Sequence, residues 1–153
     1  MQPSLGDSDY EHLLAFRTGL RRFQRWSEDQ AAAVGLTHAQ HQLLLAVRGH
    51  PDPRGPTIGD VAGYLFVRHH SAVELVDRAQ AAGLVERRPD DADQRVVRLA
   101  LTPLGQERIA ALTNLHLEEL RRLSPLFDAL VTGLEEPKGA GAATTLVPPD
   151  ASR

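Results

Sequence analysis

Apolar residues recur at spacings of three and four along the first part of the chain, a pattern that indicates an amphipathic helix. Leu13, Phe16 and Leu20 mark this stripe, which lies in a stretch without proline from about residue 8 to residue 34. Gly35 follows, and glycine is the residue that most readily ends a helix. The predicted helix is long for a small domain, which indicates packing beyond its own core.

Thr37 and Thr57 each precede an apolar-periodic segment, and each is followed three residues later by a side chain that can cap the same turn. Such a capping box marks the start of a helix. Between the two segments, residues 49–56 hold three prolines and two glycines, which indicates a loop. A further helix is predicted over about residues 68–82, because Gly83 follows its apolar stripe.

Signals for strands and then for helices follow this helix. Residues 84–88 and 95–101 predict two short strands, and the polar, proline-containing stretch between them predicts a tight hairpin. Residues 102–103 and 124–125 both read as a hydroxyl cap followed by proline, which is a helix start signal. We therefore expect two helices after the hairpin, the second running to about residue 134.

Composition narrows the class of protein. The chain has 153 residues, a formal net charge of −3 and no cysteine, which excludes disulfides, thiolate metal sites and a cysteine nucleophile. Residues 135–153 are rich in Gly, Ala, Thr and Pro and predict a flexible tail. The sequence contains no apolar run of about 20 residues and no signal-peptide pattern, so we expect a cytoplasmic protein without a membrane span.

The predicted order of elements points to one architecture. A short helix joined by a tight turn to a longer helix and followed by a two-stranded wing is a winged helix-turn-helix. In such modules the second helix of the pair enters the major groove of DNA. The predicted fold class is therefore mainly α, with a winged helix-turn-helix domain over residues 37–101.

Several separate motifs follow one another along the chain: Gly35-Leu36-Thr37, Leu75-Val76-Asp77-Arg78, Gly83-Leu84-Val85-Glu86-Arg87, Asp93-Gln94-Arg95 and Leu101-Thr102-Pro103-Leu104-Gly105. Together they resemble the MarR family of bacterial transcriptional regulators. The resemblance covers about residues 10–134 and implies a homodimer that binds double-stranded DNA, which we expect to be a repressor. Residues 8–34 and 102–134 would form a helical dimerisation layer. Their apolar stripes fit this role, because a partner has to cover them.

The start of the predicted recognition helix offers the first candidate DNA contacts. These are Arg68, His69, His70 and Ser71. Donors at a helix start can reach phosphates and base edges; the alternative is a solvated helix start with Ser71 as its cap. Glu74 either accepts from a cytosine amino group or pairs with Arg78 four residues later, and we favour the ion pair. Arg78 is then a structural partner or a phosphate contact.

The predicted wing carries the second set of candidates. Asp93 and Arg95 match the wing motif of the family, and the resemblance implies that the Asp orients the Arg for insertion into the minor groove. The alternative is a surface ion pair of little energetic weight. Arg87, Arg88 and Arg98 are further candidates for phosphate contacts.

The charge of residues 68–98, which include the predicted recognition helix and wing, has to be reconciled with DNA binding. Residues 68–98 hold six arginines and six acids, whereas non-specific DNA affinity depends on positive charge. DNA binding therefore requires the fold to separate the signs, with Asp77 and Glu86 facing away from DNA. The alternative is a winged-helix module for protein–protein assembly without strong DNA binding.

Other functions find weaker support in the sequence. No phosphate-binding loop, G-x-S-x-G or H-E-x-x-H pattern occurs, so we expect neither an enzyme nor a cofactor. His38 and His41 are three residues apart, yet no tight ligand cluster predicts a metal site. The resemblance also implies a crevice for a small aromatic or anionic effector, lined by Phe16, Trp26 and His41. We favour the alternative, that Phe16 and Trp26 are core or dimer residues.

Overall fold

The computed structural model describes residues 5–135, so the tail predicted over residues 135–153 lies outside the described residues except for its first position. The elements of the described part are α1 (Asp7–Ala33), α2 (His38–Gly49), α3 (Ile58–Leu65), α4 (His69–Ala81), β1 (Val85–Pro89), β2 (Val97–Leu101) and α5 (Pro103–Glu135). Mainly helical structure with a two-stranded sheet is the predicted fold class. None of the helices in this part is long and apolar enough to cross a membrane.

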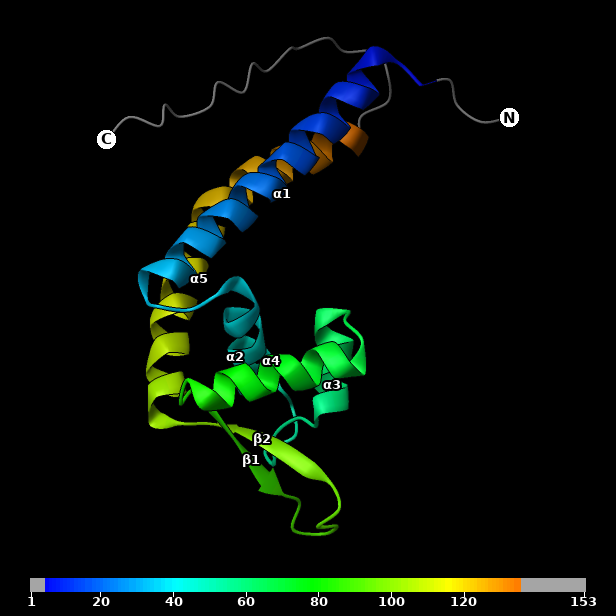
Figure 1. Cartoon of the computed structure of the whole chain (residues 1–153). Helices are drawn as coiled ribbons and strands as arrows, with labels where there is room; N and C mark the ends of the chain where they lie inside the picture. The colour runs from blue at the N-terminus through cyan, green and yellow to red at the C-terminus, as the bar shows by residue number, and fades with distance from the viewer. Residues whose placement is uncertain (1–4, 136–153) are drawn as a thin grey trace.

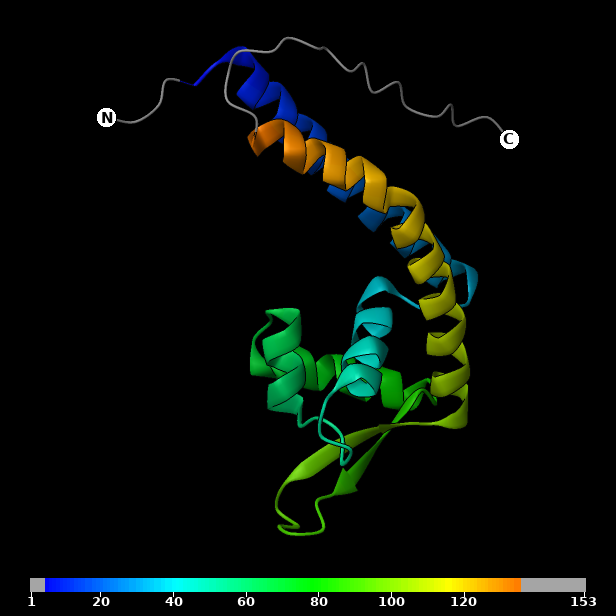
Figure 2. The same cartoon turned by 180° about the vertical axis from the view of Figure 1, so that it is seen from behind.

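The molecule consists of a long arm and a compact lobe (Figure 1). The arm is α1 together with residues 113–135 of α5, which run side by side. The lobe, residues 37–112, holds α2, α3, α4, the hairpin and the start of α5. Seen from behind, α5 leaves the hairpin and bends on its way into the arm (Figure 2). One helix therefore connects the two parts.

Glycines end two of the helices as the sequence predicted. Gly35 has φ of 76°, and its N–H donates to the carbonyl of Ala32 at 3.0 Å. The N–H of Leu36 donates to the carbonyl of Ala31 at 2.9 Å, which completes a Schellman motif. Gly83 ends α4 in the same left-handed conformation, with φ of 73°. A side chain at either position would strain this turn.

Both predicted capping boxes are confirmed. Thr37 Oγ1 accepts from the N–H of Gln40 at 3.1 Å, and Gln40 Oε1 accepts from the N–H of Thr37 at 3.0 Å. Thr57 and Asp60 make the equivalent pair of bonds at 3.1 and 2.9 Å. These bonds satisfy backbone donors that the first turn of a helix leaves open, so they set the starts of α2 and α3.

The prediction of two helices after Thr102 is wrong, because α5 is one helix of 33 residues with Pro125 inside it. Proline removes a backbone hydrogen bond and usually kinks or breaks a helix. Here the residues beyond it pack on α1: the Phe127 ring meets Phe16 edge-on with centroids 5.8 Å apart, and Leu130 is buried. Packing beyond the proline continues the helix despite the missing bond.

The hydrophobic core lies in the lobe. Its largest fully buried side chains are Leu43, Leu44, Leu99, Ile109, Leu112, Val61, Val76, Val85 and Pro56. Ala31 at the end of α1 joins the same cluster. The arm is thus anchored to the lobe at the end of α1 and through the start of α5, which limits how freely the two parts move against each other.

The hairpin is antiparallel, with Val85 opposite Leu101 and Pro89 opposite Val97. The loop between α2 and α3 packs along its edge, where the N–H of Leu99 donates to the carbonyl of Pro56 at 2.9 Å. At residue 55, which has φ of 87°, a Cβ would lie 2.1 Å from the carbonyl oxygen of Leu99. Only glycine permits this close approach, which holds the base of the wing against the lobe.

Candidate nucleic-acid interface

The start of α4 presents three polar side chains to solvent. Arg68 is the N-cap residue but makes no side-chain capping bond, and the helix begins at His69. Arg68, His69 and His70 are all exposed, whereas Ser71 is half-buried. The alternative in which Ser71 caps the helix is wrong, because Ser71 is already its third residue. The geometry leaves the first turn of α4 open to an outside acceptor.

The exposed face of α4 carries Glu74 and Arg78, while Ala72 and Val76 are buried on the opposite face. The ion pair favoured from the sequence is not formed. Arg78 Nε instead donates to the backbone carbonyl of Glu74 at 3.4 Å, and no ion pair of the described residues joins the two side chains. An exposed pair of this spacing gains only about 0.3–0.5 kcal/mol, too little to fix two long side chains.

At the tip of the wing, Asp93 holds Arg95. Asp93 Oδ1 accepts from Nε of Arg95 at 3.0 Å and from its backbone N–H at 3.1 Å, while Oδ2 accepts from Nη2 at 3.0 Å. The guanidinium of Arg95 lowers the pKa of Asp93, so this carboxylate stays charged. The Arg95 side chain is still 91% exposed. The predicted pair therefore exists, and it orients the arginine without burying it.

At the base of the wing lies Asp90, which is only 4% exposed. Its Oδ1 accepts from the backbone N–H groups of Ala92 at 2.8 Å and Asp93 at 3.2 Å. Its Oδ2 accepts from Arg98 Nε at 2.8 Å and from Arg54 Nη1 at 3.2 Å. The N–H of Ala92, followed by the guanidinium of Arg98, lowers the pKa of Asp90. Asp90 thus joins the wing turn, β2 and the α2–α3 loop.

Sequence reasoning missed Asp90 and Arg54 as parts of the site. The signal available was the acidic loop after Pro89, since an Asp that bonds the backbone two residues later makes an Asx-turn. The partners on the far side, Arg54 and Arg98, had no sequence signal because they come from distant segments. Asp90 Oδ1 also accepts from the backbone N–H of Asp93, the residue that orients Arg95. Asp90 is therefore a positioning residue for the wing tip.

Replacing Asp90 by asparagine tests this positioning role. The amide cannot accept from both guanidinium groups and keep both backbone bonds, so we expect the thermal midpoint to fall by about 3–8 degrees. Amide exchange at Ala92 and Asp93 should accelerate, because their acceptor is weakened. Asp91→Asn, an exposed neighbour, is the matched control. Equal exchange rates in wild type and Asp90→Asn would show that the wing turn holds without this carboxylate.

Three arginines predicted to contact phosphates make internal contacts. Arg98 is 15% exposed in its side chain and also donates to the carbonyl of Gly55 at 3.2 Å, so a phosphate contact does not fit its burial. Arg87 Nη2 donates to Asp77 at 2.6 Å. Arg88 pairs with Glu86. The acids predicted to face away from DNA are thus neutralised by neighbouring arginines, and Arg87 and Arg88 stay candidates without a test.

Comparison with known proteins shows what the lobe resembles. Residues 34–96 match the model of the MarR family, which covers α2 to the wing loop. The winged-helix part of this chain is thus similar to the MarR family. The resemblance seen in the sequence motifs is therefore confirmed, and so is the predicted winged helix-turn-helix.

Individual known proteins are similar to this chain over different shares of its length. An uncharacterized HTH-type transcriptional regulator of Bacillus subtilis, YsmB, is 38% identical over 71 residues, which are 46% of this chain and 49% of that protein. The chain thus spans about half the length of this curated relative. A crystal structure of a MarR family transcription regulator is 26% identical with a TM-score of 0.69, covering 84% of this chain and 83% of that one.

MepR of Staphylococcus aureus, a transcription regulator of the multidrug efflux pump MepA, is 20% identical with a TM-score of 0.67. The match covers 78% of this chain and 93% of that one. A structure of MepR in complex with DNA gives a TM-score of 0.62 at 20% identity, covering 78% and 91% of the two chains. At this identity the likeness shows a shared fold, which here includes the arm as well as the lobe.

The residues expected to line an effector crevice do not come together as one group. Trp26 lies against His116 with ring centroids 4.9 Å apart, and His116 lies 4.7 Å from His41 by the same measure. Phe16 instead contacts Phe127 further along the arm. The reason is helix geometry, since Phe16 and Trp26 are ten positions apart on α1, about 15 Å along the helix axis.

His116 joins the arm of the protein to its lobe. Its Nδ1 donates to the carbonyl of Leu112 at 2.7 Å, which leaves Nε2 to accept from the Ser27 hydroxyl at 2.7 Å. Beside it, His41 is 3% exposed, and its Nδ1 has no hydrogen-bond partner among the described residues. In the same part of the chain, no three His, Asp or Glu side chains are grouped so as to hold a metal ion.

Acid should destabilise the protein through His41. Burial, and then the proximity of His116 and His38, lowers the pKa of His41 from 6.5 to about 4. Between these values the unfolded chain binds a proton that the folded chain does not, so the free energy of unfolding falls as the pH drops from 6.5 towards 4. We expect this group to account for about 2–3 kcal/mol of that loss.

Urea denaturation of wild type and His41→Leu over pH 4–7 measures the effect. The curve of the variant should be flatter between pH 6.5 and pH 4, and the two should run parallel below pH 4, where carboxylates titrate in both proteins. Parallel curves over the whole range would mean that His41 titrates normally in the folded state.

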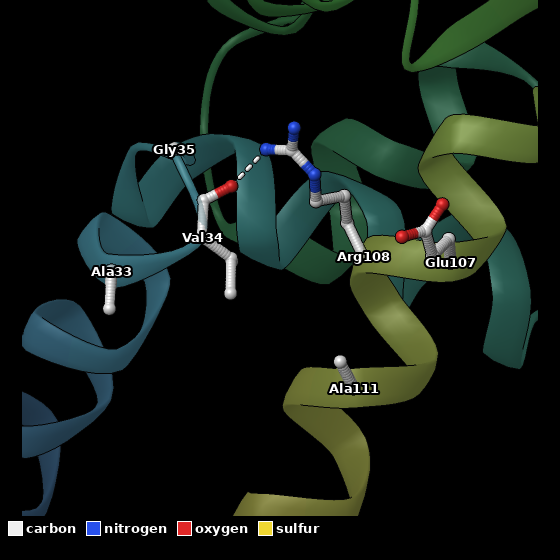
Figure 3. A pocket seen from close by; sticks show the side chains of 6 residues that line it. All are labelled: Ala33, Val34, Gly35, Glu107, Arg108 and Ala111. Carbon is white, nitrogen blue, oxygen red and sulfur yellow. Dashed lines mark hydrogen bonds between the residues drawn. The ribbon is translucent and has the colours of Figure 1, made fainter.

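An open hollow lies where α1 ends and α5 begins (Figure 3). Its volume is about 450 Å³, and its lining residues are Ala33, Val34, Gly35, Glu107, Arg108 and Ala111. Arg108 Nη1 donates to the carbonyl of Val34 across it. Neither Trp26 nor His41 lines the hollow. Arg108 has a structural role in it, because a guanidinium interacts favourably with the carbonyl groups at the C-terminus of a helix. It is therefore distinct from the predicted effector crevice.

Proposed function

We propose that this protein is a sequence-specific regulator of transcription that binds double-stranded DNA as a homodimer and acts as a repressor. One observation carries the proposal: Arg95 is oriented by Asp93 at the wing tip while its side chain stays 91% exposed. An arginine that pairs with Asp93 at the surface contributes little to the fold, but it suits a narrow and strongly negative minor groove.

The recognition helix supplies the second element of the proposed interface. Arg68, His69 and His70 are exposed at its open first turn, which suits phosphates and base edges of the major groove. Further along, Glu74 is free of the predicted ion pair and is able to accept from a cytosine amino group. The solved complex of MepR with DNA supports this role for the shared fold.

The arm supplies the proposed dimer interface. Large apolar side chains are exposed along both of its helices: Tyr10, Leu13, Leu14 and Leu20 on α1, and Leu115, Leu117, Leu120, Leu126 and Val131 on α5. An exposed apolar surface of this extent needs a cover, and a second copy of the arm would provide a matching one. Two lobes held in this way would read half-sites about 34–36 Å apart.

A small aromatic or anionic effector is proposed to act where Trp26, His41 and His116 meet. This cluster joins the arm to the lobe, so a ligand that prefers one arrangement of the two parts would change DNA affinity. The unpartnered Nδ1 of His41 supports the proposal, because a buried polar atom is costly without a partner. The chain has no cysteine, so thiol oxidation is excluded as the signal.

A protein–protein assembly module is the second candidate function. The pairing of Arg87 with Asp77 and of Arg88 with Glu86 favours it, because these arginines are partly neutralised within the lobe. Affinity for DNA would then be low even at low salt.

Selection of bound duplexes from a random pool separates the two functions. The regulator should enrich a pseudo-palindrome with half-sites about one helical turn apart, and its affinity should fall steeply with salt. A second selection in the presence of aromatic acids tests the effector, which should change the yield of bound DNA. No duplex binding at low salt would instead favour the assembly module.

A further inference from the structure

The turn between α3 and α4 holds a residue in an unfavourable conformation. Phe66 ends α3 with φ of 54° and ψ of 40°, which is the left-handed region. Bulky side chains seldom adopt this conformation, since it favours glycine and asparagine. In the described residues, Phe66 is the only non-glycine residue with positive φ.

The same side chain gains no burial that would offset the strain. It is 95% exposed, the highest value of any large apolar side chain in the described part of the chain. Neighbouring Tyr64 is also partly exposed, but its hydroxyl is bonded to His50 Nδ1 at 2.9 Å. The backbone strain at Phe66 is therefore not offset by burial of its ring, and strain of this kind is typical of functional sites.

The charge around Phe66 indicates which partner it meets. Residues 61–73 contain no Asp or Glu, although the whole chain has a net charge of −3. The same segment carries Arg68, His69 and His70 immediately after the turn. The turn and the first residues of α4 thus carry one arginine, two histidines and no acid, a charge that suits a polyanion.

We propose that the Phe66 ring contacts DNA, packing against the deoxyribose and thymine-methyl surface beside the major groove that α4 enters. This inference rests on the proposed function. The position follows from the fold, because the turn leads directly into the first residues of α4 (Figure 1). Apolar contact with thymine methyl groups is a recognised mode of base readout. Such an apolar contact also adds affinity without adding positive charge. Residues 68–98 need this, because their arginines and acids are equal in number.

The proposal is tested by substitutions that distinguish the effect of the aromatic ring from that of the backbone conformation. Phe66→Asn and Phe66→Gly both tolerate the left-handed conformation, and Phe66→Leu keeps an apolar side chain in the strained one. Each protein is titrated against a duplex of about 30 base pairs selected by the wild type, at several salt concentrations. Thermal midpoints and oligomeric state are measured on the same samples.

We expect Phe66→Asn and Phe66→Gly to bind about fivefold more weakly or worse, while Phe66→Leu stays closer to the wild type. The thermal midpoint of Phe66→Asn should rise, because the strain is relieved. The slope of log affinity against log salt should not change, because the ring neutralises no phosphate. Loss of Arg95, in contrast, should reduce that slope by about one.

Other outcomes overturn the proposal. Affinity within twofold of the wild type in both Phe66→Asn and Phe66→Gly would show that the ring does not touch DNA. A variant that becomes monomeric would place Phe66 in a subunit interface instead. If the wild type itself binds no duplex, the proposed function fails and this inference fails with it, which is a different result from normal wild-type binding with unaffected variants.

Discussion

Replacing Arg95 by alanine is expected to weaken binding to a selected operator at least tenfold, with a thermal midpoint within about two degrees of the wild type. The arginine is held by Asp93 but 91% exposed, so we expect it to contribute contacts to DNA and little to the fold. Its loss also leaves the carboxylate of Asp93 facing the phosphates without a counter-charge. Both effects lower affinity in the same direction.

Fluorescence anisotropy against the selected duplex measures the change. Arg48→Ala is the control, because Arg48 is an exposed arginine on α2 in the lobe, outside both the wing and the arm. The control should bind as the wild type does. Arg95→Lys should recover only part of the affinity, since lysine keeps the charge but not the planar fork. Wild-type affinity in Arg95→Ala would disprove the role given to the wing.

Replacing Leu14 by glutamate is expected to convert the protein to a monomer and to weaken operator binding about a hundredfold. Leu14 is 64% exposed on α1 in the single chain, so the change should cost a monomer little stability. In a symmetric dimer it places two carboxylates in an apolar interface. A monomer then binds each half-site separately and loses the gain from linking two binding events.

Sedimentation and anisotropy together test this second prediction. Leu45→Glu serves as control, because Leu45 is 45% exposed on α2 in the lobe and lies outside the arm. It should remain dimeric and bind DNA with nearly unchanged affinity. If Leu14→Glu stays dimeric, the arm does not form the dimer interface.

Features set by neighbouring residues could be predicted from the sequence. The capping boxes at Thr37 and Thr57 depend on side chains three residues away, and the helix ends at Gly35 and Gly83 depend on a single φ angle. The Asp93–Arg95 pair is equally local. For these features the physical cause lies within one turn of chain, so the pattern of residues contains it.

Features set by distant contacts could not be predicted. The continuation of α5 through Pro125 depends on packing between Phe127 and Phe16, which are far apart in sequence. The role of Arg98 at the base of the wing depends on Asp90 and on the loop that carries Arg54. In both cases the local sequence pattern predicted a different structure or role, and tertiary contacts determined the one observed.

The most direct test of the account is a hydroxyl-radical footprint of the wild-type protein on its selected duplex, compared with that of Arg95→Ala. We expect two half-sites about one helical turn apart, flanked by protected minor-groove tracts where the wings lie. Arg95→Ala should lose these outer tracts at concentrations where the central protection remains. A single protected half-site, or outer tracts that survive the loss of Arg95, would contradict it.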